Sequence, residues 1–316
     1  MENFMSNDDV IRVYVGVDRS QLLAVPVLEY SIKRHTTAKV EVIPMLDLPV
    51  PVPQDPRNSQ RTGFSFSRLC IPKLAGYKGR AIYLDADMLV MKDIRELWNI
   101  PFDGAKIIVQ QEVKHQEETT NKLGAPKVRK KQSAVMLLDC ERLDWKIEDI
   151  VRGMDEGKYD YDQLMFEFCI LDESEVKYGV PFEWNSLEHW EPNTCLVHYT
   201  DVYTQPWTAC GNKNGHLWFA EVRRMLADGS LKMSQIEEEV RLGYFRPSLI
   251  KDIKYRHLVP SFFHTIWDKK NQATDKLSGY VPHKAVYDQK RVRNKAIKEY
   301  EAKLKAEAEK NISAAN

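Results

Sequence analysis

The sequence predicts an α/β protein with a mostly parallel central sheet and a helical C-terminal extension. Six apolar runs have the length of strands, at residues 11–17, 40–46, 81–84, 105–109, 134–138 and 195–199. Segments of helical pattern lie between several of these runs, and this alternation is typical of parallel sheets covered by helices. After Trp207 the apolar residues recur at helical spacing, in segments that end near Gly229 and Gly243.

The segments between the strands carry signals of their own. We expect a helix over about residues 26–35, a short helix over 64–76 and an apolar helix over 160–171. Residues 111–131 are rich in Lys, Glu and Gln and predict a long exposed loop. Loops of that length are often functional.

The composition excludes several classes of protein. Apolar residues make up 43% of the chain, which excludes a disordered protein. Lys+Arg and Asp+Glu are both 46, so we expect no nucleic-acid partner. The five cysteines are widely spaced without a CxxC pair, which argues against a disulfide framework and a structural zinc site. The acidic N-terminus and the lack of an 18-residue apolar run predict a cytoplasmic protein.

Two carboxylates directly follow a buried strand, at Asp85 and Asp87. Residues two apart on an extended segment face the same way, so both can reach one cation. Such hard oxygen ligands suit Mg²⁺ or Mn²⁺ holding a diphosphate. Ligands of parallel sheets bind at the carboxyl ends of strands, which also draws attention to Asp18 and His198. The simpler alternative for an isolated pair of Asp residues is a strand-ending turn.

Two classes of enzyme place Asp-x-Asp after a strand, and the sequence context separates them. Haloacid-dehalogenase phosphatases carry it on their first strand with Thr or Val two residues later, whereas here Leu89 occupies that position and the strand at 11–17 comes first. Glycosyltransferases of the GT-A fold use it to hold the metal of a nucleotide-sugar. A nucleotidyltransferase would need a Gly-rich basic loop after the first strand, and residues 17–21 are not one.

The order of motifs resembles the family 8 glycosyltransferases, the family of glycogenin and the bacterial lipopolysaccharide glucosyl- and galactosyltransferases. The resemblance rests on Phe66-Ser-Arg68-Leu-Cys-Ile-Pro72-Lys-Leu followed by Tyr83-Leu-Asp85-Ala-Asp87-Met-Leu-Val. Further motifs follow in the family's order over about residues 11–210: Val13-Tyr-Val-Gly16-Val-Asp18, Gln132-Ser133-Ala134-Val135-Met136, Asp162-Gln163, Glu183-Trp184-Asn185, Val197-His198-Tyr199 and Pro206-Trp207.

The resemblance implies a retaining transferase that moves a hexose from a UDP-sugar, and it implies roles for individual residues. The ion, Mn²⁺ or Mg²⁺, would be bound by Asp85, Asp87 and His198. The nucleotide and donor sugar would be bound by Val15, Gly16, Asp18, Arg68, Asp85, Ala86, Asp87, Gln132 and Ser133. Asp162 and Gln163 would be the catalytic candidates beside an oxocarbenium-like centre. A covalent intermediate and same-face substitution both remain open. Outside this motif order, His198 would more often be a core residue and Arg68 a surface residue.

The resemblance also implies a division of the chain and a set of partners. We expect a GT-A catalytic domain over residues 8–215, a helical extension over 216–283 and a charged helical or frayed tail over 284–316. The acceptor is open: a glycan, lipid, protein or small metabolite. The tail has nine Lys/Arg against five Asp/Glu up to Lys310, so peripheral membrane contact is an alternative to a solvated helix.

Some positions depart from the family's pattern. Gln132 and Ala134 stand where the family has Asn and Gly, which leaves the donor sugar open. Gln205 stands where a lysine normally holds the departing diphosphate by charge, so Lys213 or Lys127 would have to substitute. A non-catalytic sugar-nucleotide-binding or scaffold protein of the same fold is the alternative that this loss favours.

Overall fold

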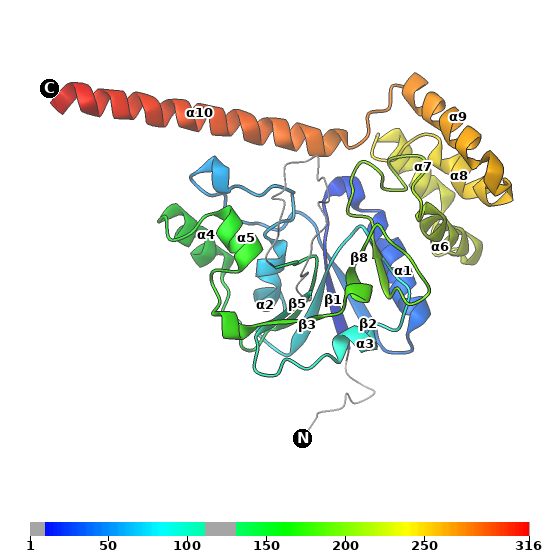
Figure 1. Cartoon of the computed structure of the whole chain (residues 1–316), viewed down its shortest axis with the longest axis horizontal. Helices are drawn as coiled ribbons and strands as arrows, with labels where there is room; N and C mark the ends of the chain where they lie inside the picture. The colour runs from blue at the N-terminus through cyan, green and yellow to red at the C-terminus, as the bar shows by residue number, and fades with distance from the viewer. Residues whose placement is uncertain (1–9, 111–130, 316) are drawn as a thin grey trace.

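The central sheet contains six strands in the order β2-β1-β3-β6-β5-β7 (Figure 1). They are β1 (Ile11–Gly16), β2 (Val40–Met45), β3 (Arg80–Asp85), β5 (Ile107–Gln110), β6 (Val135–Asp139) and β7 (Val176–Val180). Neighbouring strands pair in parallel except that β6 is antiparallel to both β3 and β5. The predicted α/β class with a mostly parallel sheet is therefore confirmed.

A second, small sheet lies beside the first and has the order β4-β9-β8. Its strands are β4 (Met88–Val90), β8 (Ser186–Leu187) and β9 (Leu196–His198). The run at 195–199, which the sequence places among the strands of the fold, thus pairs with the segment just after β3 rather than joining the central sheet.

This computed structural model describes residues 10–110 and 131–315. Residues 111–130 of the predicted loop lie outside the described part of the chain. The α-helices of the first two-thirds are α1 (Ala24–His35), α2 (Ile71–Leu74), α3 (Arg95–Trp98), α4 (Ile147–Asp155) and α5 (Tyr161–Glu167). Short 3-10 helices cover Arg19–Gln21, Pro56–Asn58, Ser67–Cys70, Glu173–Glu175, Phe182–Asn185, Arg256–Leu258 and Ser261–Phe263.

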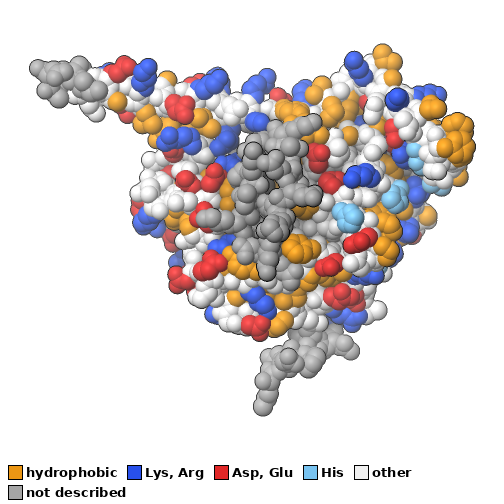
Figure 2. Space-filling view, in the orientation of Figure 1, with side chains coloured by type: hydrophobic (Ala, Val, Ile, Leu, Met, Phe, Trp, Pro, Cys, Tyr) orange, Lys and Arg blue, Asp and Glu red, His pale blue; other side chains and the backbone are white. Residues whose placement is uncertain are grey.

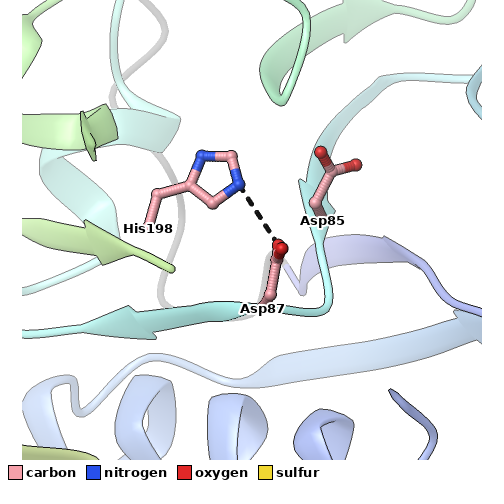
Figure 3. A group of neighbouring side chains, drawn as sticks. All are labelled: Asp85, Asp87 and His198. Atoms are coloured by element: carbon pink, nitrogen blue, oxygen red, sulfur yellow. Dashed lines mark ion pairs between the residues drawn. The ribbon is translucent and has the colours of Figure 1, made fainter. Parts of the chain in front are cut away.

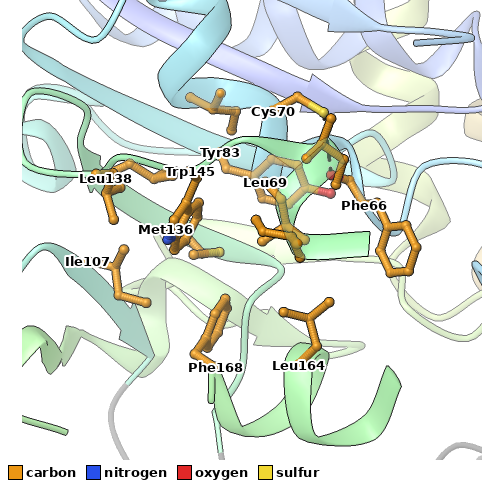
Figure 4. Packing of buried hydrophobic residues seen from close by; sticks show 14 of the residues in the cluster. Phe66, Leu69, Cys70, Tyr83, Ile107, Met136, Leu138, Trp145, Leu164 and Phe168 are labelled. Atoms are coloured by element: carbon orange, nitrogen blue, oxygen red, sulfur yellow. Dashed lines mark hydrogen bonds between the residues drawn. The ribbon is translucent and has the colours of Figure 1, made fainter. Parts of the chain in front are cut away.

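The predicted helix at 160–171 is shorter in the structure and ends at Glu167. Phe168 follows it with φ of 49°, a left-handed conformation that stops an α-helix. The Phe168 ring is fully buried, so packing holds this unusual backbone in place (Figure 4). The apolar run continues past the helix because these residues fill the core, which a helical pattern alone does not reveal.

Both faces of the central sheet are buried, and successive residues of a strand enter different cores. Tyr83 of β3 packs with α4 and α5 on one face, together with Met136 and Leu138 of β6 (Figure 4). Ile82 and Leu84 of the same strand pack on the other face, where α1 and α3 cover the sheet. This explains why the strands read as continuous apolar runs.

The C-terminal helices α6 (Gly215–Asp228), α7 (Met233–Arg241), α8 (Leu249–Tyr255) and α9 (His264–Leu277) form a separate group at the side of α1 (Figure 1). A third core joins them to the sheet layer through Trp207 and Trp218. Glu221, which is 1% exposed, pairs with Arg34 of α1. The expected helical C-terminal extension is therefore present, and both apolar packing and ion pairs attach it.

The last element is α10 (Lys284–Ala315), a long helix that crosses the top of the molecule in Figure 1. Its C-terminal part extends beyond the body, and Lys and Arg side chains lie along it (Figure 2). Arg293 donates from Nη2 to the carbonyl of Arg57 at 2.7 Å, which holds the helix against the loop before α2. Among the described residues, no helix is both long and apolar enough to cross a membrane.

Candidate functional site

The two sheets meet where the chain leaves β3, and this junction places the Asp-x-Asp segment. Gly16 at the end of β1 is paired in register with Asp85 at the end of β3. The Gly16 carbonyl then accepts from the amide of Ala86 at 3.0 Å, which directs the chain out of the central sheet. The next residues form β4, whose Met88 is paired with His198 of β9. Backbone pairing therefore brings His198 to the carboxylates from more than 100 residues away.

Asp85, Asp87 and His198 each offer a ligand atom, and these atoms all lie within 4.8 Å of one another. Nε2 of His198 is 3.2 Å from Oδ1 of Asp87. Figure 3 shows the imidazole and this carboxylate facing each other, with Asp85 beside them. The side chain of Asp87 is 12% exposed and that of His198 is 5% exposed. The position of His198 on a strand thus coincides with a cluster of carboxylates rather than with apolar neighbours alone.

A second layer of hydrogen bonds orients the imidazole. Nδ1 of His198 lies 2.9 Å from Oδ1 of Asn185, whose amide nitrogen donates to Gln110 Oε1 at 2.7 Å. Because a carboxamide oxygen only accepts, Nδ1 carries a proton, so in the neutral ring the lone pair is on Nε2. Oδ1 of Asp87 is buried without a hydrogen-bond partner among the described residues. With the ring neutral, two electron-rich atoms face each other, an arrangement that a shared cation stabilises.

The charges of the cluster act on the pKa values of its members. Burial lowers the pKa of His198, but the carboxylates of Asp87 and Asp85 raise it by more, so the net shift is upward. Burial also raises the pKa of Asp85, against the opposing charge of Arg68. Neighbouring carboxylates therefore dominate the shift of His198, whereas burial dominates the shift of Asp85.

Arg68 is buried and anchors the Asp85 side of the cluster. Its guanidinium donates to Oδ1 of Asp85 at 3.3 Å and to Oγ of Ser133 at 2.7 Å, and it lies 4.4 Å from the centre of the Tyr83 ring. The alternative of a surface arginine does not hold, because the side chain is 8% exposed. A Cβ built on Gly16 would lie 2.2 Å from the Tyr83 hydroxyl oxygen, so only glycine fits where β1 ends beside this group.

Gln205 occupies the position of the family's lysine and is fully buried. Its Nε2 donates to Oδ2 of Asp87 at 2.9 Å and to the carbonyl of Tyr199 at 3.0 Å. The side chain thus holds a carboxylate in place rather than facing an open space. Of the two lysines considered as substitutes, Lys213 is exposed and Lys127 lies outside the described residues.

The remaining nucleotide candidates lie around the ends of β1 and β6. Asp18 follows β1 and accepts from the Ser20 amide at 2.9 Å; burial raises its pKa, and the charge of Asp87 adds to that effect. Val15 and Ala86 are fully buried, so only their backbone atoms could meet a ligand. Gln132 is partly buried, next to Ser133 at the start of β6.

Asp162 and Gln163 stand at the start of α5 and make no contact with the Asp85–Asp87–His198 cluster among the described residues. Asp162 is half exposed and forms an ion pair with Arg61. Gln163 accepts from the amide of Asp160 at 2.9 Å, while its own amide donates to Asp160 Oδ1 at 2.9 Å. This reciprocal pair is a capping box, so in the structure the Gln163 side chain begins a helix.

Sequence reasoning assigned no role to several residues that shape the site. Asn185 and Gln110 orient His198, and Gln205 holds Asp87. Asn185 belongs to the motif Glu183-Trp184-Asn185, so the sequence already indicates its position. The sequence does not indicate that Gln110 contacts Asn185 or that Gln205 contacts Asp87, because these side chains come from separate segments that meet only in the folded chain.

Residues 19–150 match the sequence model described as glycosyl transferase family 8. This stretch, 132 of the 316 residues, is similar to that family. The predicted resemblance to family 8 is therefore confirmed, and the match includes Asp85 and Asp87 but ends before His198. The match supports a transferase acting on a sugar donor and an acceptor, without identifying either.

Comparisons of sequence and of structure add further proteins to which this chain is similar. Protein CDI of Arabidopsis thaliana is 28% identical over 238 residues, which cover 70% of this chain and 89% of that protein. The galactosyltransferase LgtC, solved with donor and acceptor sugar analogs, has a TM-score of 0.49 at 14% identity over 71% of this chain and 97% of that one. The glycosyltransferase GlyE of Streptococcus pneumoniae TIGR4 has a TM-score of 0.47 at 15% identity over 68% of this chain. The match spans 60% of the GlyE chain, less than two-thirds of its length.

Proposed function

We propose that the protein is a retaining, metal-dependent glycosyltransferase that moves a hexose from a UDP-sugar to an acceptor. Asp85, Asp87 and His198 hold the divalent ion, and the diphosphate of the donor completes its coordination. The family 8 match supports the reaction class, and the motif order supports the UDP-sugar donor and the retained configuration.

One observation carries the metal assignment. Oδ1 of Asp87 is buried without a hydrogen-bond partner among the described residues, and it lies 3.2 Å from His198 Nε2, which carries the lone pair when the ring is neutral. A divalent cation accepts electron pairs from both atoms, and the set of two carboxylates and one imidazole suits Mn²⁺ or Mg²⁺. The residues present therefore fit the ion that the family implies.

The surrounding residues prepare this site. Arg68 and the Tyr83 hydroxyl both donate to Oδ1 of Asp85, at 3.3 and 2.5 Å, which fixes the carboxylate and offsets part of its charge. Gln205 fixes the other carboxylate, and Asn185 fixes the imidazole tautomer. Outer partners of this kind typically change metal affinity by about 10- to 100-fold. When bound, the ion stabilises the negative charge that develops on the leaving diphosphate.

Binding without turnover is the second candidate, and Gln205 is the observation that favours it. A lysine at this position would contribute positive charge to the diphosphate, whereas Gln205 is neutral, fully buried and committed to Asp87. A protein that binds a sugar nucleotide without cleaving it would need the cluster but not that charge.

The two candidates differ in the fate of the donor. We would screen UDP-, GDP- and ADP-sugars by thermal shift, with Mn²⁺ or with EDTA, and then measure hydrolysis of the best ligand. A transferase releases UDP slowly even without its acceptor, whereas a binding protein shows the Mn²⁺-dependent shift without release. Equal shifts with Mn²⁺ and with EDTA would contradict the metal assignment. The control variant Asp139→Asn should keep the Mn²⁺-dependent shift of the wild type. Asp139 is paired with Arg80, the first residue of β3, and so lies at the opposite end of that strand from Asp85.

A further inference from the structure

The start of α10 lies over the candidate donor site, although 85 residues separate it from His198 in the sequence. The Tyr287 ring is 6.3 Å from the ring of Tyr203, which belongs to the loop that follows β9. A Cβ built on Gly63 would lie 3.5 Å from Cβ of Asp18 and 3.6 Å from Nε2 of Gln289. The first turns of α10 therefore extend from the loop after His198 to the end of β1.

His283 immediately precedes α10 and is 6% exposed. Its Nε2 is buried without a hydrogen-bond partner among the described residues. The carboxylates of Asp201 and Asp87 are near enough to act electrostatically on the imidazole, and both lie toward the loop after β9 or the cluster. A buried nitrogen without a partner is costly unless a ligand satisfies it.

The backbone around His283 points to the same place. His283 has φ of 53°, a left-handed conformation, and its carbonyl accepts from the amide of Tyr287 at 3.0 Å to begin the helix. The amides of the first helical turn precede that bond and have no intrahelical acceptor. A helix N-terminus carries partial positive charge and attracts anions. One unpartnered buried imidazole and one helix N-terminus thus occur together where α10 meets the loop after β9.

Among the described residues, the family motifs leave the diphosphate end of the donor site without an assigned cationic partner. Gln205 is turned toward Asp87, and Lys213 is exposed. We propose that His283 and the N-terminus of α10 complete this end of the site, with Nε2 of His283 donating a hydrogen bond to the diphosphate of the donor. This inference rests on the proposed function, because it requires a sugar nucleotide at the cluster. Burial lowers the pKa of His283 to about 4, so the imidazole is neutral at pH 7 and acts as a hydrogen-bond donor.

The test uses two variants of His283 in the full chain. Gln places an amide nitrogen near the position of Nε2, whereas Asn places it near Nδ1 and also tolerates the left-handed backbone. We would titrate UDP in the presence of Mn²⁺ by calorimetry, with uridine as the ligand that lacks phosphate. Loss of a hydrogen bond to a charged group predicts that His283→Asn weakens UDP binding by about 10- to 100-fold. His283→Gln should restore most of it, and uridine affinity should not change. Lys290→Ala is the matched control, because Lys290 is an exposed residue on the same helix.

The outcomes separate this inference from the function on which it rests. If the wild-type protein does not bind UDP with Mn²⁺, the proposed function is wrong and this inference falls with it. If the wild type binds UDP and His283→Asn binds it equally well or more tightly, the function stands and the role of His283 is wrong. Equal losses for UDP and uridine would also overturn the inference, because they indicate a structural role for the side chain.

Discussion

The two predicted parts of the site differ in how the fold positions them. Asp85, Asp87 and His198 lie at the ends of hydrogen-bonded strands, and the Asp87 side chain is 12% exposed. Asp162 and Gln163 lie at the first turn of a short helix, and the Asp162 side chain is 52% exposed. Strand β3 of the central sheet and the β4–β9 pair of the small sheet hold the first group, whereas a capping box and one ion pair hold the second.

This difference indicates which part can change without loss of the fold. A strand end is fixed by backbone bonds on both sides, so its ligands are already oriented before a ligand arrives. A helix start held by one exposed ion pair gains about 0–1 kcal/mol from that pair, so Asp162 can leave Arg61 at little cost. We therefore expect the first group to control metal and nucleotide binding, and the second to affect later steps.

The largest effect should follow Asp87→Ala. The change removes one ligand and leaves His198 Nε2 and Gln205 Nε2 without their carboxylate. At ~100-fold excess over Kd, UDP with Mn²⁺ should stabilise the wild type by about 3 kcal/mol, and the variant should lose the Mn²⁺-dependent part entirely. Thermal melts with Mn²⁺ and with EDTA measure this. If UDP with Mn²⁺ raises the melting temperature of Asp87→Ala as much as that of the wild type, the cluster does not control metal binding and the comparison fails.

The second prediction concerns the pH dependence of stability that the buried His283 causes. The pKa of His283 falls from 6.5 to about 4 on folding because the ring is buried. The unfolded chain therefore binds this proton first, and unfolding is favoured as the pH falls from about 6.5 to 4. The difference in unfolding free energy between the wild type and His283→Asn should change by about 3 kcal/mol over that range and stay constant above pH 7. Urea melts at several pH values test it, and parallel curves would contradict the shift.

The third prediction separates a ligand from a core histidine. His198→Ala should fold and should weaken Mn²⁺-dependent UDP binding by at least about 10- to 100-fold, the loss that even outer partners of metal sites cause. The dependence of UDP affinity on Mn²⁺ concentration is the measurement. His216→Ala, on α6, is the control. If His198→Ala loses stability but keeps the Mn²⁺ dependence, the residue belongs to the core and the ligand assignment fails.

The smallest effects should come from the start of α5. Gln163→Ala removes one half of the capping box and should cost about 0.5–1 kcal/mol of stability. Asp162→Asn should leave Mn²⁺–UDP affinity unchanged and lower the transfer rate, because it alters charge without touching the cluster. Stability, UDP affinity and turnover measured on both variants would sharpen the comparison. A loss of UDP affinity in Asp162→Asn would show that the two parts act together at the binding step.

Much of the fold was predictable because period-two and period-3.6 patterns are local properties of the chain. Such patterns predict β1, which ends at Gly16, and β3, which ends at Asp85. They also predict the helices after Trp207. Strand β7 was not predicted, because a five-residue segment that contains Lys and Gly gives a weak signal by itself; in the structure it pairs with β5. Pairing partners are distant in sequence, and no local pattern encodes them.

The sequence by itself indicated the resemblance to family 8, the α/β class and the positions of the candidate ligands, because motif order and apolar spacing can be followed along the chain. Only the tertiary structure decided that Gln205 holds Asp87, that Asn185 orients His198, and that the start of α10 packs against the loop after β9. These are contacts between segments separated by more than ten residues in every case. Their formation depends on which surfaces the folded sheet leaves adjacent, and that is a property of packing rather than of sequence order.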